Sequence, residues 1–387
     1  MVAAFEMKRK ASMYVRAKVS KTGELNDKKL WAHSISEDLF KKITSIPEGK
    51  NHGMIMYLDM SGSMRDNLVS TIEQLINLSM FCNKINIPFE VYGFTDRSSY
   101  RRITDIHTPS DDVEIKDKDL NIHDLSLIKM LSSSFTKAQM ETAYKCLILW
   151  RDSFSHIGRK YRYTELYHKC NHLELGSTPL NTTIIVGTEV AKRFRENNNV
   201  EILNTIFLTD GEATDSGDYF SVCNEGVIRH ERAKTIRNLH IKYGSSVRPV
   251  FNSRGASSVV NLTTTMLEIY KDLTGSKAIN YHLLPYWTKT SIDNTDDYYF
   301  AGHTGDFKYR EWEEIVKKGR KSGVIEIEDK VGFDVRYLVS DRSMNITDES
   351  LTVESNKKSD LVKGFKKFAE TKAKSRVFVQ KFIPQIV

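Results

Sequence analysis

The chain has 387 residues, a formal net charge of +7, 40% hydrophobic residues and 28% charged residues. These values are typical of a soluble globular protein, and the length suits one large domain or two ordinary ones. No run approaches the roughly 18 consecutive apolar residues that a membrane-spanning helix needs, and the start lacks the apolar stretch of a signal peptide. We therefore expect a cytoplasmic protein with no membrane partner. The four cysteines form no CxxC pair, which argues against a disulfide framework or a zinc ribbon.

The positive charge is concentrated near the C-terminus. Residues 356–381 contain nine Lys and Arg but only two acids, which leaves 48 basic and 48 acidic residues in the rest of the chain. Such a cationic segment suits an acidic protein surface or the phosphates of a nucleic acid. Leu361, Phe365 and Phe368 recur at helical spacing in the same segment, however, which equally indicates a helix with a solvated basic face.

In chain order, the charged residues 1–51 predict a helical or irregular extension. The apolar run 54–60 is typical of a strand buried on both faces, and the spacing of apolar residues over 66–86 predicts a helix. A second strand is predicted at 88–96. Strand, helix and strand with short connections form a βαβ unit, which implies a parallel sheet covered by helices.

Residues 95–176 interrupt this alternation and include a helical pattern at 135–152, so we interpret them as an insertion into an α/β core. The alternation then resumes with a helix, a strand, two helices and a strand, which we expect at 178–197, 201–212, 224–244, 257–275 and 277–285.

The predicted fold is therefore α/β, with a doubly wound, mostly parallel sheet and helices on both faces over residues 52–285. Residues 286–387 form an α/β C-terminal extension with two short strand patterns, 324–328 and 333–341, and the basic helix. We expect this extension to cap or extend the core.

Polar side chains follow two of the predicted strands. Asp59, Ser61 and Ser63 come directly after the first strand, Asp210 ends a later strand, and Thr178 precedes a helix. Because ligands of open α/β sheets gather at the carboxyl ends of the strands, we expect these residues at one edge. Hydroxyl and carboxylate oxygens suit Mg²⁺, Mn²⁺ or Ca²⁺ rather than zinc. Alone, the first cluster could be an ordinary turn whose serine caps the next helix.

The three motifs "DMSGSM", "STPLN" and "LTDGE", in this order, resemble the metal-ion-dependent adhesion site of von Willebrand factor A (VWA) domains. The resemblance implies the Rossmann-like VWA fold over residues 52–285. It implies Ser61 and Ser63 as direct metal ligands and Thr178 as a direct or water-mediated ligand. Asp59 and Asp210 would then act through water, and no position of the motif is missing.

A second resemblance concerns residues 22–43, "TGELNDKKLWAHSISEDLFKKI". Through Leu25, Leu30, Phe40 and Lys41 they are similar to the segment that leads into the A domain in the T subunit of aerobic cobaltochelatase. Stand-alone versions of this arrangement occur in large T-even-type tailed phages, which "GKNHG" and "KGFKKFAETKAKSRVFVQKFI" also resemble. A phage origin would place the protein in the host cytoplasm. The acidic middle region of the chelatase subunit is absent.

These resemblances imply a Mg²⁺-dependent adaptor without intrinsic catalytic activity, which binds a partner protein's Asp or Glu at the metal. The implied partner is a ring-forming AAA+ ATPase of the MoxR or chelatase type, since the chain has no GxxxxGK[ST] loop of its own. One alternative is an enzyme component: the non-ATPase subunit of a cobalt or magnesium chelatase. Another is a phage nucleic-acid-binding or virion-assembly factor that uses the basic C-terminal segment.

Overall fold

A computed structural model of the chain describes the following residues: 18–25, 40–45, 51–96, 119, 125–154, 173, 175–211, 213–214, 218–222, 228–232, 240–249, 258–288, 306–327, 332–344 and 377–386. Most of the basic segment 356–381 therefore lies outside the described residues, as does Leu30. None of the described helices is long and apolar enough to cross a membrane.

A seven-stranded sheet forms the centre of the molecule, in the order β12-β13-β11-β6-β3-β4-β5. The five inner strands are parallel, and the two edge strands, β5 and β12, are antiparallel to their neighbours. The bounds are β3 (His52–Asp59), β4 (Phe89–Thr95), β5 (Ser126–Ser132), β6 (Ile202–Thr209), β11 (Lys277–Leu284), β12 (Val324–Ile327) and β13 (Val335–Ser340).

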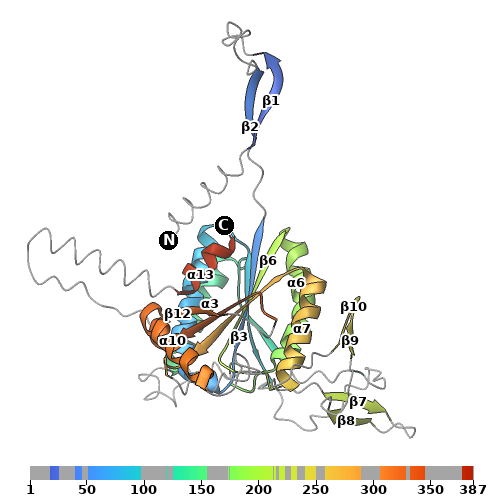
Figure 1. Ribbon diagram of the computed structural model, residues 1–387, viewed down its shortest axis with the longest axis vertical. Helices are drawn as coiled ribbons and strands as arrows, with labels where there is room; N and C mark the ends of the chain where they lie inside the picture. Colours follow the sequence, from blue (N-terminus) through green and yellow to red (C-terminus); the bar gives the residue numbers. More distant parts are fainter. Residues whose placement is uncertain are drawn as a thin grey trace, which may run out of the picture.

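Helices cover both faces of this sheet, as Figure 1 shows. One face carries α2 (Leu68–Lys84), α3 (Lys137–Phe154) and α13 (Val377–Ile386). The other carries α6 (Leu180–Asn198) and α7 (Ser258–Thr274), whose core also includes Val316 of α10 (Asp306–Ser322). The predicted doubly wound α/β fold is thereby confirmed.

The central strand β3 is apolar without interruption because each face of the sheet is covered. Met54, Met56 and Leu58 lie in the core beneath α2, whereas Ile55 and Tyr57 lie in the core beneath α6, and none of them is exposed to solvent. This double burial explains why the strand was predictable from its sequence.

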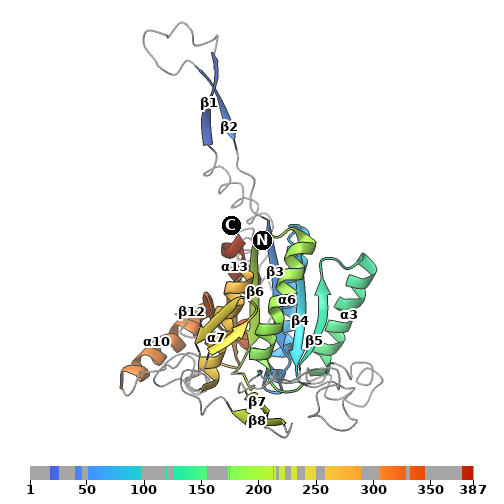
Figure 2. The same cartoon turned by 90° about the vertical axis from the view of Figure 1, so that its right-hand side faces the viewer.

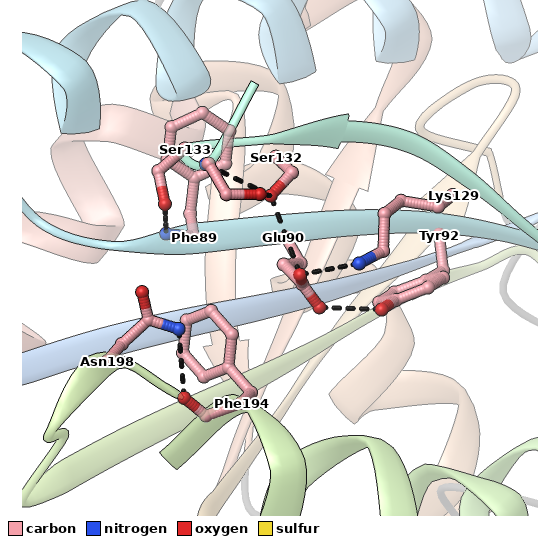
Figure 3. A network of polar contacts seen from close by, with 9 residues as sticks. Phe89, Glu90, Tyr92, Lys129, Ser132, Ser133, Phe194 and Asn198 are labelled. Carbon is pink, nitrogen blue, oxygen red and sulfur yellow. Dashed lines mark hydrogen bonds and ion pairs between the residues drawn. The ribbon is translucent and has the colours of Figure 1, made fainter. Parts of the chain in front are cut away.

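The insertion contributes to the main sheet, which the sequence pattern did not predict. Its strand β5 pairs with β4, and α3 lies beside β5 at the edge of the molecule (Figure 2). Figure 3 shows a contact across this pair: the Lys129 ammonium of β5 lies 2.6 Å from the carboxylate of Glu90 in β4, which also accepts a 2.6 Å hydrogen bond from Tyr92 of its own strand. The edge strand is therefore fixed by a charged contact as well as by its backbone ladder.

The helix expected over 224–244 is wrong wherever that region is described. Two strands occur instead, β8 (Ile228–Arg232) and β9 (His240–Tyr243), each in an antiparallel hairpin with β7 (Asp218–Val222) or β10 (Ser246–Pro249). Gly244 has φ +55° directly after β9, and glycine at this position favours a two-residue hairpin turn over a helix. The turn at Gly244 therefore goes with a β9–β10 hairpin, although the spacing of the apolar residues predicted a helix.

Of the two terminal extensions, the N-terminal one differs from expectation in its described residues. In the N-terminal extension, β1 (Lys18–Leu25) and β2 (Phe40–Ser45) pair as an antiparallel hairpin rather than forming helix or irregular chain (Figure 1). Beyond residue 285, β12 and β13 join the central sheet and α13 packs beneath it. The C-terminal region therefore extends the core, one of the two arrangements expected for it.

Candidate metal centre

Three separate segments meet at the carboxyl edge of the sheet. The neighbouring strands β3 and β6 are parallel and in register, with Leu58 opposite Leu208, so Asp59 and Asp210 emerge at the same edge. Ser61 and Ser63 follow β3 in a loop that leads through a short 3-10 helix, Ser63–Asp66, into α2. Thr178 approaches from a third segment, directly before α6.

Backbone hydrogen bonds fasten the third segment to the serine loop. The Gly62 N–H donates to the Gly176 carbonyl and the Gly176 N–H donates to the Met60 carbonyl, both at 2.9 Å. On the other side, the carboxylate of Asp96, which follows β4, accepts a 2.7 Å hydrogen bond from the Ser177 N–H. Thr178 is thus held in place by the segments after β3 and after β4.

The five predicted site residues form one continuous chain of hydrogen bonds. Asp59 Oδ1 accepts from the Ser61 N–H at 2.8 Å, and the Thr178 side chain also hydrogen-bonds to Asp59. The Ser61 and Ser63 hydroxyls lie 3.0 Å apart, and Ser63 donates to Asp210 Oδ1 at 2.9 Å. The structure therefore brings all five together, while their role as metal ligands remains a prediction.

The two carboxylates of this cluster are in an unfavourable environment. Asp59 is fully buried, and burial raises its pKa well above the ordinary value, with the nearby Asp210 charge raising it further. Burial also raises the pKa of Asp210 to about 6, despite the hydrogen bonds that Ser63 and Asn67 give to it. In addition, the buried Asp59 Oδ2 has no hydrogen-bond partner among the described residues. Among the described residues, no positively charged group is identified that would lower the pKa of either carboxyl.

The donor set fits a hard divalent cation. It consists of three hydroxyls and two carboxylates, and it contains no sulfur or imidazole. Within the ranges that the structure describes, no three His, Cys, Asp or Glu side chains come together in a way that could hold a metal ion. A cation site built from hydroxyls is therefore the arrangement that this edge of the sheet offers.

Sequence reasoning missed the contributions of two residues. Asp96 ends a predicted strand, and its position at a third strand end was a usable signal for its contact with Ser177. Asn67 stands where α2 begins and would be predicted only as a helix cap, so nothing in the sequence indicated its contact with Asp210. Glu212, beside Asp210, lies outside the described residues.

Comparisons with known proteins leave the family open. No protein-family model matches the chain, and no curated protein matches it. Two crystal structures of the pilus adhesin SpaC from Lactobacillus rhamnosus GG, one in an open conformation, match with a TM-score of 0.32 at 13% and 12% identity. The matches cover 70% of this chain but only 30% and 31% of the adhesin chains. Function must therefore be inferred from the site itself.

Proposed function

We propose that this chain is a VWA-type adaptor whose Mg²⁺ site binds a carboxylate of a partner protein. The observation that carries the proposal is the single hydrogen-bonded cluster of Asp59, Ser61, Ser63, Thr178 and Asp210. These residues occupy the motif positions that the VWA resemblance implies as metal ligands. They also lie at the carboxyl edge of a doubly wound sheet, where that resemblance expects them.

The residues of this chain divide into an inner and an outer part of the site. Asp59, Ser61 and Thr178 are buried, whereas Ser63 is exposed and Asp210 is partly exposed. When bound, Mg²⁺ (or Mn²⁺ or Ca²⁺, which take the same oxygen ligands) supplies a positive charge with a coordination position for an external carboxylate. The outer pair, Ser63 and Asp210, therefore marks the side from which a partner approaches.

For the partner, we propose a ring-forming AAA+ ATPase of the MoxR or chelatase type. The support is the resemblance of residues 22–43 to the segment before the A domain in the cobaltochelatase T subunit. Within it, Leu25 of β1 and Phe40 of β2 are paired in the N-terminal hairpin. The chain contains no phosphate-binding GxxxxGK[ST] loop, so ATP hydrolysis would be supplied by the partner.

Of the two alternative functions, one uses the same metal site and the other uses the basic C-terminal segment. A role as the non-ATPase subunit of a metal chelatase would use the same metal site and the same class of partner. A nucleic-acid-binding role would use the basic C-terminal segment, yet Phe378 within it and Phe382 directly after it are fully buried in α13 and are not available to stack on bases. The burial of these two rings weighs against base stacking, and the adaptor remains our proposal.

A change that abolishes Mg²⁺ binding should also abolish partner binding. Isothermal titration calorimetry with MgCl₂ should detect binding to the wild-type chain and none to the Ser61→Ala, Ser63→Ala double variant, because two hydroxyl oxygens are removed. A pull-down from the native host lysate should retain a partner with Mg²⁺ and release it with EDTA.

A matched control is Ser134→Ala. Ser134 is exposed, and its neighbour Ser133 contacts Phe89 at the start of β4, at the end of the sheet opposite the candidate metal centre. This variant should behave like wild type in both measurements. Partner capture that survives both EDTA and the double substitution would contradict the proposed adaptor mechanism.

A further inference from the structure

The side chain of Asn67 is placed unusually for a residue at the start of a helix. Asn67 is the residue before α2, and Asn at this position commonly accepts hydrogen bonds from the first-turn N–H groups. Here its backbone is already helical and its side chain makes no such bond. The side chain instead lies close enough to Asp210, a residue of the candidate metal centre, for hydrogen bonding to lower the pKa of that carboxyl.

The backbone of Asn67 is firmly held. Its carbonyl oxygen accepts hydrogen bonds from the Thr71 N–H at 3.1 Å, from the Thr71 hydroxyl at 2.6 Å and from the Ser70 hydroxyl at 3.2 Å. Because these contacts fix the main chain, the side chain is presented to Asp210 from a rigid position at the head of α2. The contact is therefore built into the fold.

One atom of this side chain is left without a partner. Asn67 is 2% exposed, and its Oδ1 makes no hydrogen bond to any residue that the structure describes. A buried acceptor of this kind destabilises a protein unless a donor reaches it. The oxygen and nitrogen of an amide share one carbon, so Oδ1 lies next to the Asp210 carboxylate that the nitrogen contacts.

We propose that Asn67 is part of the cation site, where its amide N–H holds the Asp210 carboxylate and its Oδ1 accepts a hydrogen bond from water bound to the cation. This inference rests on the proposed function, because it assigns a further residue to the same site. Mg²⁺ retains several of its waters when a protein binds it, and each such water is a donor that needs an acceptor.

The chemistry of the unpartnered groups supports a hydrated cation over an anion. Asn67 Oδ1 is an acceptor, and so is Asp59 Oδ2 when that carboxyl is ionised, so a species that donates hydrogen bonds would satisfy both. The carboxylates of Asp59 and Asp210 would in addition repel an anion. Waters held by a divalent cation satisfy both requirements.

Titration of the full-length chain with MgCl₂ tests this assignment. Asn67→Ala should bind Mg²⁺ about 10- to 100-fold more weakly than wild type, the usual effect of removing a residue that orients metal ligands. Asn67→Asp has the same shape but places a negative charge at the acceptor position. It should bind Mg²⁺ more tightly than Asn67→Ala and show a larger Mg²⁺-induced rise in unfolding temperature than wild type.

The matched control is Asn77→Ala, the same substitution within α2, at a side chain that donates to the Glu73 carbonyl. It should retain wild-type Mg²⁺ affinity. If Asn67 only stabilises the fold, both Asn67 variants will change unfolding in EDTA but bind Mg²⁺ within twofold of wild type, and the assignment is overturned.

Two further results are also decisive. An Asn67→Asp chain whose Mg²⁺ affinity falls as far as that of Asn67→Ala would overturn the assignment of Oδ1 to the water shell. A wild-type chain that binds no Mg²⁺ would overturn the proposed function and this inference together. Wild-type binding that neither Asn67 variant alters would overturn this inference alone.

Discussion

At the scale of single residues, the two carboxylates of the candidate metal centre dominate its electrostatics. Asp210 has a pKa raised to about 6, and the pKa of Asp59 is raised as well, in both cases mainly by burial. The folded chain therefore binds protons that the unfolded chain has already released. A cation at this site would favour the ionised forms and oppose the effect.

This protonation predicts a distinctive pH dependence. Without metal, the free energy of unfolding should fall as pH rises from about 4 to about 6, by up to about 3 kcal/mol for Asp210, because the folded state binds the extra proton there. Urea unfolding in EDTA across this range measures the effect. Saturating Mg²⁺ should make this decrease in the free energy of unfolding smaller. Asp59→Asn should weaken it, because one of the two interacting carboxylates is gone, whereas stability that rises over this range would contradict the prediction.

Which residues meet at the site could be predicted only in part. Asp59, Ser61, Ser63, Thr178 and Asp210 were identified because each stands at the end of a strand or the start of a helix, in the order of a known motif. The contacts of Asn67 and Asp96 depend on where a loop turns and in which direction a side chain leaves it. Sequence spacing does not contain that information.

At the scale of elements, the packing of α6 on β3 supports the position of Thr178. Tyr57 of β3 is fully buried and stacks on Phe207, with ring centroids 5.2 Å apart. A Cβ atom at Gly187 of α6 would lie 2.9 Å from the Tyr57 hydroxyl oxygen. Glycine at this position therefore allows the helix that follows Thr178 to approach the central strand closely.

Gly187→Ala should destabilise the chain by about 1–2 kcal/mol. Overpacking of a core costs about 1–3 kcal/mol, and the gain in helix propensity of up to about 1 kcal/mol offsets only part of it. The second variant is Gly187→Ala combined with Tyr57→Phe, which removes the clashing hydroxyl. That hydroxyl has no partner among the described residues, so the combination should recover most of the loss in urea unfolding. Equal destabilisation in the single and double variants would locate the strain elsewhere.

Elements were predictable to the extent that burial dictated their composition. The strands β3, β4, β6 and β11 and the helices α2, α6 and α7 have apolar patterns that match their burial, and each was expected close to its observed bounds. The edge strand β5 was missed because its first four residues are only partly buried or exposed, so its pattern is weak. The strand β9 was missed because its pairing with β10 depends on the turn at Gly244, and β8 was missed because it pairs with β7 outside the central sheet.

At the scale of the whole molecule, the end of the described chain closes the core. Phe378 and Phe382 of α13 are fully buried, and the Phe378 ring lies 4.7 Å from that of Tyr281 in β11. The Lys277 ammonium of the same strand donates a 2.5 Å hydrogen bond to Gln385. The helix at the end of the basic segment is therefore a structural part of the fold, packed against the sheet beside α2.

Phe378→Ala should lower the free energy of unfolding by about 3–5 kcal/mol, because a fully buried aromatic ring is removed from the core. Lys381→Ala in the same helix removes a positive charge that lies 5.1 Å from the Tyr337 ring, and it should cost about 1 kcal/mol or less. Urea unfolding of both variants measures the difference. A small effect of Phe378→Ala would mean that α13 does not stabilise the core.

The sheet order, by contrast, could be only partly predicted. A parallel, doubly wound sheet follows from alternating strands and helices, whereas the addition of β12 and β13 at one edge and β5 at the other depends on pairings between distant segments. The division at residue 285 does not appear in the sheet, because β13 pairs with β11 across it.

The hydrogen bond between Ser177 and Asp96 has one more consequence. It joins two residues 81 positions apart, so the segment of the chain that contains β5 and α3 begins and ends at neighbouring residues. Thr178 is the next residue after Ser177. The Asp96 carboxylate thereby ties the residue before Thr178 to the end of β4, so a shift of that strand end would displace the threonine of the cation site.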